Sequence, residues 1–382
     1  MATGTDAGLL DSPRPQSVYK HGILEQHAIR YATMTASRLD PKRAVLFDGF
    51  AGRGRFDGGQ AASAEQMMLA AQKMKKSTQI DIFLVERKKE DYLQLETVAD
   101  QYRGQGFDIE TRYGDCGDYL DEVVTYAKGA SLFLFLDPCG AMLPFDTLSE
   151  IVKGRPNWPR TEFLMNFNAD LVRRAGGQYK KGQLDQPGIA SLDKVCGGEW
   201  WRELALQAHI ESGEKDWEAA AEAVAVEYGR RLTRNTPFGW VVAPVRRQMH
   251  HQPVYFLIFL TMDPHGLWVF GAAAAKARQK WLDFLGPDQE TRDGMLFDAV
   301  EEQFKSEQTQ AAEEITANVR ELVADGKPKK VVEHTTTIFG DVWGEALEKT
   351  FSLALRQLVA AGEVEYVEKG NKPHQHVIRK AS

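Results

Sequence analysis

The 382-residue sequence has few cysteines and nothing that resembles a secretory leader. Its three cysteines, Cys116, Cys139 and Cys196, are too few and too scattered for a disulfide framework or a closed zinc site. We therefore expect no bound metal and a reducing, cytoplasmic location. The first residues lack a basic stretch followed by an apolar core, so we expect no secretory signal.

Long apolar runs and an excess of positive charge are also missing. The longest apolar runs, such as residues 254–260, are too short to cross a bilayer, so we expect no membrane partner. A formal net charge of −7 argues against a protein that coats nucleic acid by bulk electrostatics, although it leaves room for local basic patches. With 43% hydrophobic and 26% charged residues, the chain has the composition of a folded protein.

Short apolar runs alternate with helix-prone stretches through the first half of the chain. The runs cover residues 44–50, 80–86, 107–115, 131–137 and 161–167, with helices expected at 63–76, 88–103 and 116–128. Runs that are apolar on both faces and joined by crossover helices are typical of a buried parallel sheet. Two further runs, at 239–248 and 253–261, predict an antiparallel pair. We expect an α/β fold with a Rossmann-like, doubly wound, mostly parallel sheet of seven strands.

The remaining segments predict the domain organisation. Residues 1–17 are small, polar and proline-bearing, as in a disordered lead-in, and an amphipathic helix follows at 20–39. The Rossmann-like domain is expected at 18–300, with a helical insertion at 173–235. Residues 310–382 predict two helices and a two-stranded ribbon, which indicates a small α+β, winged-helix-like domain. Lysines and arginines in that ribbon make nucleic acid a candidate partner.

Acidic and glycine residues follow successive predicted strands. In the segment VLFDGFAGRG, Asp48 precedes a turn that includes Gly49, Phe50, Ala51, Gly52 and Gly54. Glu86 ends the second strand, where a carboxylate can accept hydrogen bonds from both hydroxyls of a ribose. Asp115 and Cys116 follow the third strand, where an acid and a backbone amide can bind an adenine. Taken alone, Asp115 would be an ordinary helix cap.

The order of these features favours one cofactor. The phosphate-binding loop with its lysine and serine or threonine is absent, and so is the strict GxGxxG pattern of dinucleotide sites. The spacing resembles that of the class I methyltransferases, in which an acid before the glycines is followed by acids after strands two and three. This resemblance implies S-adenosylmethionine as the cofactor, bound by Asp48 to Gly54, Glu86, Asp115, Cys116 and Asp137.

Asp137 ends a strongly apolar strand in the segment LFLFLDPCG and is followed by Pro138. The segment resembles the acidic form of the motif with which amino-directed methyltransferases hold a planar amine. In that motif the acid and a backbone carbonyl accept the amine's hydrogens, which leaves the lone pair for the methyl group. The resemblance assigns Asp137 and Pro138 to catalysis. Cys139 and Gly140 replace the second proline and the aromatic residue of the motif, so substrates other than a base stay open.

Other residues are candidates for the substrate side. Asn166 follows the fifth strand, whose end is expected to face the same crevice, and we assign it to the catalytic group. His21 and Glu25 lie four residues apart on one helical face, and they either point into the crevice or form a surface pair. Arg173 and Arg174 belong to a glycine-bearing basic segment, which is either a mobile phosphate-binding loop or a merely solvated one.

Over the whole chain, the motifs resemble those of the three-Cys-motif partner protein (TcmP) family. The similar blocks are, in order, KHGILEQH, DGFAGRG, LFLDPCG, FLMNFN with Arg173 after it, and YFLIFLT before a tryptophan-ending helix. They run over roughly residues 19–285, and their joint order carries the resemblance. The family is methyltransferase-like, so the resemblance implies the fold, and its name implies a partner protein that bears a three-cysteine motif.

Three functions remain as hypotheses. The first is an S-adenosylmethionine-dependent methyltransferase that acts on a nucleic acid or a nucleotide-like amine, in which Asp137 orients the acceptor. The second is a non-catalytic, methyltransferase-like scaffold that docks a protein or DNA. The third is a small-molecule methyltransferase with the helices at 190–235 as a lid. Because methyl transfer is an in-line displacement, alignment and desolvation can supply most of its acceleration without a catalytic triad.

Overall fold

The computed structural model describes residues 14–140, 142–213, 217–248, 251–285 and 294–381. The chain divides into two compact units. One comprises the residues up to Gln16 and Ala28–Met262, and the other comprises Ser17–His27 and Asp263–Ser382. Most of the predicted lead-in, residues 1–13, lies outside the described residues. Helix α1 (Pro15–Ala36) begins five residues before the predicted helix, with its proline in the first turn, where a missing N–H is tolerated.

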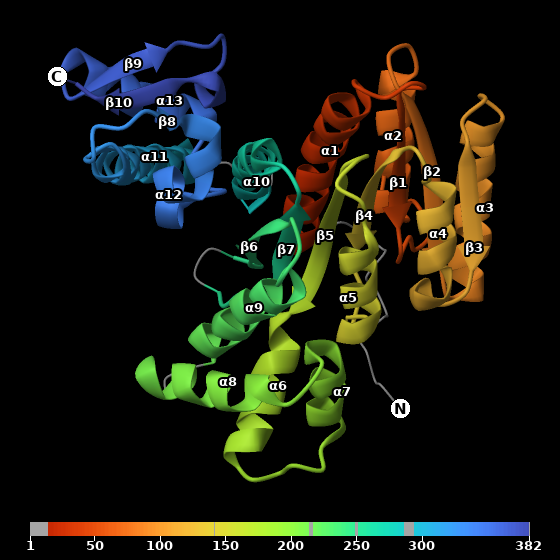
Figure 1. The fold of residues 1–382 in the computed structure, drawn as a ribbon. Helices are drawn as coiled ribbons and strands as arrows, with labels where there is room; N and C mark the ends of the chain where they lie inside the picture. Colours follow the sequence, from red (N-terminus) through yellow and green to blue (C-terminus); the bar gives the residue numbers. More distant parts are fainter. Residues whose placement is uncertain (1–13, 141, 214–216, 249–250, 286–293, 382) are drawn as a thin grey trace. The chain divides into compact units, whose positions relative to one another are not determined.

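The first unit is built on a seven-stranded sheet with the order β3-β2-β1-β4-β5-β7-β6 (Figure 1). Its strands are β1 (Arg43–Asp48), β2 (Gln79–Glu86), β3 (Ile109–Tyr113), β4 (Ser131–Leu136), β5 (Thr161–Asn168), β6 (Gly239–Val245) and β7 (Tyr255–Thr261). Strands β1 to β5 are parallel, and β7 is antiparallel to both of its neighbours. This confirms the predicted doubly wound, mostly parallel sheet. The chain changes direction of winding between β1 and β4, the position at which open α/β sheets bind ligands.

Helices cover both faces of this sheet, which is why its central strands are apolar throughout. On one face, α4 (Leu120–Tyr126), preceded by the short 3₁₀ helix η1 (Cys116–Tyr119), and α5 (Phe145–Gly154) pack on a core that includes Val45, Phe83 and Leu134. On the other face lie α2 (Ser63–Met74), α3 (Lys89–Arg103) and the second part of α1, whose Tyr31 ring is 5.5 Å from that of Phe133.

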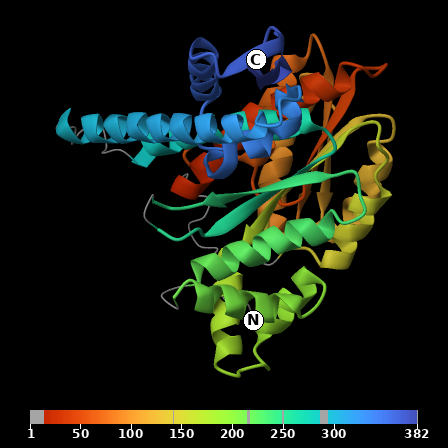
Figure 2. The same ribbon diagram turned by 60° about the vertical axis from the view of Figure 1, so that its left-hand side comes forward.

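Four helices between β5 and β6 form the predicted insertion: α6 (Ala169–Lys180), α7 (Pro187–Cys196), α8 (Trp200–Glu211) and α9 (Glu218–Leu232). Helix α9 packs against β6 and β7, with α6 and α8 beyond it (Figure 2). The prediction of a loop at the glycine-bearing basic segment with Arg173 and Arg174 is wrong, because α6 continues to Lys180. Its Gly176 packs against Trp217, and a Cβ there would clash with the indole ring. The glycine pair therefore allows close helix packing rather than a mobile loop.

The second unit combines helices with a small sheet of order β8-β10-β9. Its elements are α10 (Pro264–Leu285), α11 (Gly294–Leu322), β8 (Lys329–Lys330), η2 (Val331–His334), α12 (Thr335–Phe339), η3 (Gly340–Val342), α13 (Glu348–Ala360), β9 (Val364–Glu368), η4 (Pro373–Gln375) and β10 (Val377–Lys380). Trp268 of α10 contacts Phe339 and Phe351 edge-on in its core. Helix α10 thus belongs to this unit, although the sequence places it in the Rossmann-like domain.

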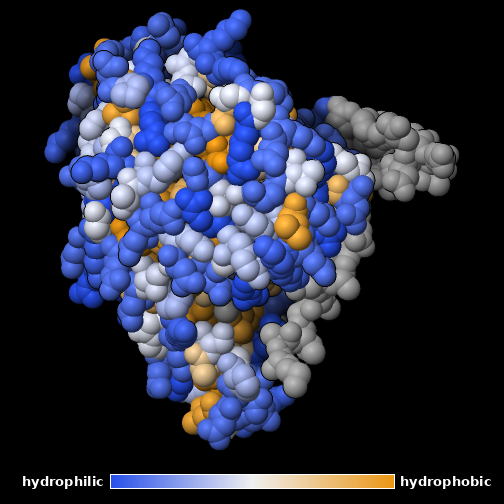
Figure 3. Space-filling view, turned by 90° about the vertical axis from the view of Figure 1, so that its right-hand side faces the viewer, coloured by the Kyte–Doolittle hydropathy of each residue, from blue (hydrophilic) through white to orange (hydrophobic). Residues whose placement is uncertain are grey.

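The face seen from the right-hand side of Figure 1 is mostly hydrophilic, with small scattered apolar spots (Figure 3). In the part of the chain that the structure describes, no helix is both long enough and apolar enough to cross a membrane. Within the same residues, no group of three or more His, Cys, Asp and Glu side chains is placed to hold a metal ion.

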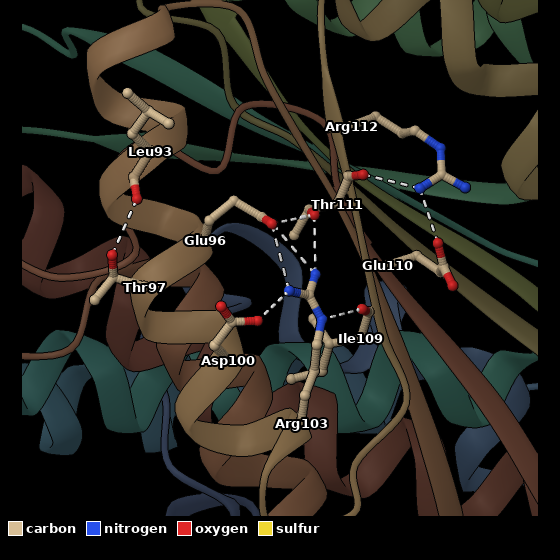
Figure 4. A network of polar contacts seen from close by, with 9 residues as sticks. All are labelled: Leu93, Glu96, Thr97, Asp100, Arg103, Ile109, Glu110, Thr111 and Arg112. Carbon is tan, nitrogen blue, oxygen red and sulfur yellow. Dashed lines mark hydrogen bonds and ion pairs between the residues drawn. The ribbon is translucent and has the colours of Figure 1, made fainter.

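An arginine-centred network ties the edge strand β3 to α3 (Figure 4). Arg103 donates from Nε to the Ile109 carbonyl and from Nη2 to Thr111 Oγ1, each at 2.9 Å. The same guanidinium reaches Glu96 at 3.2 Å and Asp100 at 2.7 Å. Because an edge strand has one unpaired side, these bonds help to fix the first half of β3 against α3.

Replacing Arg103 with methionine should lower the free energy of unfolding by about 1 kcal/mol. Methionine keeps much of the apolar contact of the arginine stem, but it removes the donor to the Ile109 carbonyl, the buried Thr111 hydroxyl and the Asp100 carboxylate. Glu96 keeps the hydrogen bond from Thr111, and the partial exposure of the arginine limits the loss. Urea unfolding measures the change. Lys76→Met, at an exposed lysine of the same unit, serves as the matched control and should be neutral. Equal stability of the two variants would contradict a structural role for the network.

Candidate functional site

The predicted acids lie side by side at the carboxyl edge of the sheet. Asp48 on β1 is level with Leu84 of β2 and Phe135 of β4. Glu86 and Asp137 stand two residues beyond those two neighbours. Because side chains alternate with a period of two, Glu86 and Asp48 lie on one face of the sheet, and continuation of β4 places Asp137 on that face too. Adjacent strands are about 4.8 Å apart, so the three carboxylates flank the point where the winding reverses.

Two backbone amides hold the Glu86 carboxylate. Oε2 accepts from the Gly52 N–H at 2.9 Å, and Oε1 accepts from the Lys88 N–H at 2.6 Å. Each carboxylate oxygen has a second lone pair, so the half-buried side chain can still accept other donors. Gly52 has a φ of +59°, a conformation that residues with a Cβ rarely adopt. The loop after β1 is therefore fixed beside the end of β2.

Asp48 anchors the same loop from below. Its side chain is fully buried, and Oδ1 accepts from the Phe50 N–H at 3.0 Å. The Gly49 N–H donates to the Phe135 carbonyl of β4 at 3.1 Å, and the Ala51 N–H donates to the β2 backbone at 2.9 Å. The loop is thus joined to the strands on both sides of β1, which preorganises its backbone for a ligand.

Two arginines that sequence reasoning passed over brace the loop. Arg53 Nε pairs with Asp91 of α3 at 2.7 Å, and Arg55 Nε pairs with the buried Glu65 of α2 at 2.7 Å. Gly54, with a φ of +79°, packs against α3 between them. The alternation Gly-Arg-Gly-Arg was the available signal. These cations bind the helices behind the loop, which leaves the acids at the strand ends as the chemical groups of the site.

Cys116 and Asp115 follow β3, as predicted, but their side chains differ. The Cys116 thiol lies under Gly49, and burial raises its pKa, with Asp48 and Asp115 adding to the shift. It therefore stays protonated and acts in packing. Asp115 is exposed and lies 3.6 Å from Arg87, at exposed fractions of 67% and 71%, so this ion pair contributes little to stability. Asp115 makes no side-chain capping bond to the following helix.

Asp137 forms a direct pair with Asn166. Leu136 and Met165 are paired across β4 and β5, which puts the next residue of each strand side by side. The Asn166 Nδ2 group donates to Asp137 Oδ1 at 2.8 Å. Asp137 is half-buried and Pro138 is buried. The structure thus brings together all three residues of the predicted catalytic group, although no part of the sequence indicated the hydrogen bond.

An aromatic residue beside Glu86 was also missed. Tyr113 is paired with Glu86 across β3 and β2, lies on the same face, and is 47% exposed. The Tyr92 ring of α3 is 5.6 Å from it, and Lys89 Nζ lies 4.6 Å from the Tyr113 ring centre. A tyrosine at the last position of a strand that is expected to end beside Glu86 was the available signal. It gives the β3 side of the site an aromatic wall.

His21 and Glu25 belong to the second unit. Glu25 Oε2 bonds Lys280 Nζ of α10 at 2.8 Å, in the same unit. Desolvation, with the nearby charge of Lys20 adding to it, lowers the pKa of His21 to about 3, so the ring is neutral at physiological pH. The structure does not bring either residue into the set of strand-end acids.

Arg173 and Arg174 lie on α6, where protein groups already engage them. Arg173 Nη1 donates to the Pro253 carbonyl at 2.6 Å, and Nη2 pairs with Asp170. Arg174 is exposed, and its Nε donates to the Asp170 carbonyl at 3.3 Å. Arg173 therefore ties α6 to the segment before β7, and Arg174 alone presents a largely exposed guanidinium.

No family model matches the chain, and no curated protein matches it. Solved structures do match it at low identity. A precorrin-6y C5,15-methyltransferase from Geobacter metallireducens has 13% identity and a TM-score of 0.27, with 60% of this chain and 86% of that chain covered. The M1A22 tRNA methyltransferase TrmK of B. subtilis has 9% identity and a TM-score of 0.27, with 85% and 97% covered.

A third similar structure is TYW2 of M. jannaschii in complex with AdoMet, with 11% identity and a TM-score of 0.26. The match covers 62% of this chain and 75% of that chain. These TM-scores are low, so the fold assignment rests on the strand order and connections described above.

Proposed function

We propose that the first unit binds S-adenosylmethionine and transfers its methyl group to a nucleotide-like amine. The observation that carries the proposal is the position of Asp48, Glu86 and Asp137 on one sheet face at three adjacent strand ends. The strand order also differs from the order 3-2-1-4-5-6 of dinucleotide-binding folds, because β7 is inserted antiparallel between β5 and β6.

The residues present suit an adenosyl group that carries a positive sulfur. Glu86 is a half-buried carboxylate with free lone pairs, as required to accept from two ribose hydroxyls. The Asp115 carboxylate and the Cys116 N–H would bind the adenine. The fixed turn from Gly49 to Gly52 lets the ligand approach the backbone closely. Asp48 and Asp137 supply negative charge for the sulfonium. When bound, S-adenosylmethionine supplies a methyl group that leaves its sulfur for a nucleophile.

Asp137 would orient the acceptor. Its carboxylate can accept one N–H of an amine, which turns the nitrogen lone pair away from the carboxylate. It can also take up the proton that the nitrogen releases after methylation. This role needs alignment more than strong basicity, which agrees with the carboxylates and the amide found at these strand ends.

The second unit supports nucleic acid as the source of that amine. We propose that this unit contains a winged helix, and the order α11, β8, α12, α13, β9, β10 with β10 in the centre of the small sheet supports this. Lys349 and Arg356 are exposed on α13, and Lys369 and Lys372 lie at the turn between β9 and β10. Exposed cations at these positions can contact phosphates. A partner protein is the alternative ligand of this unit.

Calorimetry of the full chain with S-adenosylmethionine tests the proposal. We expect saturable binding, and formation of S-adenosylhomocysteine when single-stranded DNA, RNA or small amines are offered at two salt concentrations. Turnover on a nucleic acid, with affinity that falls steeply with salt, supports the proposal. Turnover on small amines alone favours the small-molecule enzyme, and binding without turnover favours the scaffold. Absence of binding refutes the cofactor assignment.

A further inference from the structure

The orientation of the Asn166 amide is fixed by chemistry. An ionised carboxylate only accepts hydrogen bonds, so the Asn166 group that lies 2.8 Å from Asp137 Oδ1 is the NH₂ end. The amide oxygen must then accept a hydrogen bond from a different group. Asn166 is 8% exposed, and within the described residues its Oδ1 atom has no hydrogen-bond partner.

A buried acceptor without a donor is unusual and destabilising. Leu164 lies two residues earlier on the same face of β5 and is fully buried, so an apolar side chain would fit on this face of the strand. A leucine at position 166 would avoid the loss. The amide is therefore better explained by a donor that comes with a ligand than by the needs of the fold.

The donor can be identified from the two acceptors that it meets. Asp137 and Asn166 sit on neighbouring strand ends, about 4.8 Å apart, and each offers an oxygen. A hydroxyl group has one hydrogen and can satisfy only one of them. An aliphatic ammonium has no lone pair to methylate, and a carboxylate beside it would stabilise that charged form. The NH₂ group of a conjugated amine is neutral and has two hydrogens.

We infer that Asp137 and Asn166 form a two-acceptor site for the exocyclic amino group of a nucleobase. One hydrogen goes to the Asp137 carboxylate, and the other goes to Asn166 Oδ1. Asn166 also holds Asp137 through its own NH₂ group, so one side chain positions the acid and binds the substrate. The inference rests on the proposed methyl transfer and adds to it the substrate class and the second acceptor.

Binding of matched oligonucleotides tests the inference. Oligoadenylate and oligocytidylate carry amino groups where oligoinosinate and oligouridylate carry carbonyl oxygens. In the presence of saturating S-adenosylhomocysteine, we expect the wild-type chain to bind at least one amino oligonucleotide about tenfold or more tightly than its carbonyl counterpart. In Asn166→Leu this ratio should fall below about threefold. Asn157→Leu, at an exposed asparagine of the same unit, should keep the wild-type ratio.

A second variant separates this role from a structural one. Asn166→Asp keeps an acceptor but places two carboxylates in contact, so one carboxyl pKa must rise. Its preference for amino oligonucleotides should therefore change with pH between about 5 and 8, while that of the wild type stays constant. The S-adenosylhomocysteine affinity of both variants should remain within about twofold of wild type, which shows that the fold is intact.

The two proposals fail differently. If the wild-type chain binds S-adenosylhomocysteine but does not separate amino from carbonyl oligonucleotides, the two-acceptor site is wrong and the cofactor site stands. The same conclusion follows if Asn166→Leu keeps the wild-type ratio. If the wild-type chain binds no S-adenosylhomocysteine, the proposed function fails, and the inference that rests on it fails too.

Discussion

Glu86→Gln should weaken S-adenosylmethionine binding by about 100-fold or more. A hydrogen bond to a charged acceptor contributes about 1.5–3 kcal/mol, and the proposed ribose contact involves two hydroxyls. Glutamine also replaces one acceptor oxygen with an NH₂ donor. That donor would face the backbone N–H of Gly52 or Lys88, each of which now donates to the carboxylate. Both the ligand contact and the loop geometry would therefore suffer. Calorimetry with the full chain measures the loss.

The control for this change is Glu90→Gln, at an exposed glutamate four residues further along the chain. It removes the same charge from the same neighbourhood without touching the loop. Its affinity should stay within about threefold of wild type, as expected for a screened surface charge. An affinity of Glu86→Gln within that same range would show that the adenosyl group does not bind at the end of β2.

The positions of the site acids could be predicted because they depend on strand ends. Each acid follows an apolar run, and in a parallel sheet the ends of such runs meet at one edge. The seven-stranded sheet and the antiparallel β6–β7 pair follow from the same patterns, and the structure confirms them. What the sequence could not supply is the contacts between strands. The Asp137–Asn166 bond and the hold of Gly52 on Glu86 both join residues that are about 30 positions apart.

Glycine caused one wrong prediction. Gly176 and Gly177 are typical of a loop when only their neighbours along the chain are considered. In the structure both glycines lie in α6. Residue 176 has to be small because Trp217, from a later segment, occupies the space that a side chain there would need. Gly22 is similar. It lies in α1 against Ala277 of α10, a contact that helps to explain why Ser17–His27 belong to the second unit. Such glycines serve a partner that only the folded chain reveals.

Gly49 is the glycine at which this reasoning has the largest consequence. A Cβ on Gly49 would clash with Cys116 Sγ, and it would lie 3.1 Å from both Leu136 and Phe47. All three neighbours are buried, and Gly49 is bonded to β4 through its amide, so the backbone has little room to move. We expect Gly49→Ala to lower the free energy of unfolding by about 3 kcal/mol, the upper end for overpacking a core.

The clash has a specific cause, so it should have a specific rescue. Cys116→Ala removes the sulfur and alone should destabilise by about 1 kcal/mol, because it deletes one buried heavy atom. If the sulfur is the main obstacle, the double variant Gly49→Ala/Cys116→Ala should be more stable than the sum of the single effects by at least about 1 kcal/mol. Part of the loss should remain, since Leu136 and Phe47 are still close.

Urea unfolding of the four proteins measures this coupling. The same proteins also show whether the turn matters for the ligand, because Gly49 lies between Asp48 and the loop that Glu86 holds. If the double variant regains stability but does not regain S-adenosylmethionine affinity, the ligand requires a residue without a side chain at position 49. Additive effects on stability would instead show that the Cys116 sulfur is not the main obstacle, which would contradict this explanation for the loss of stability in Gly49→Ala.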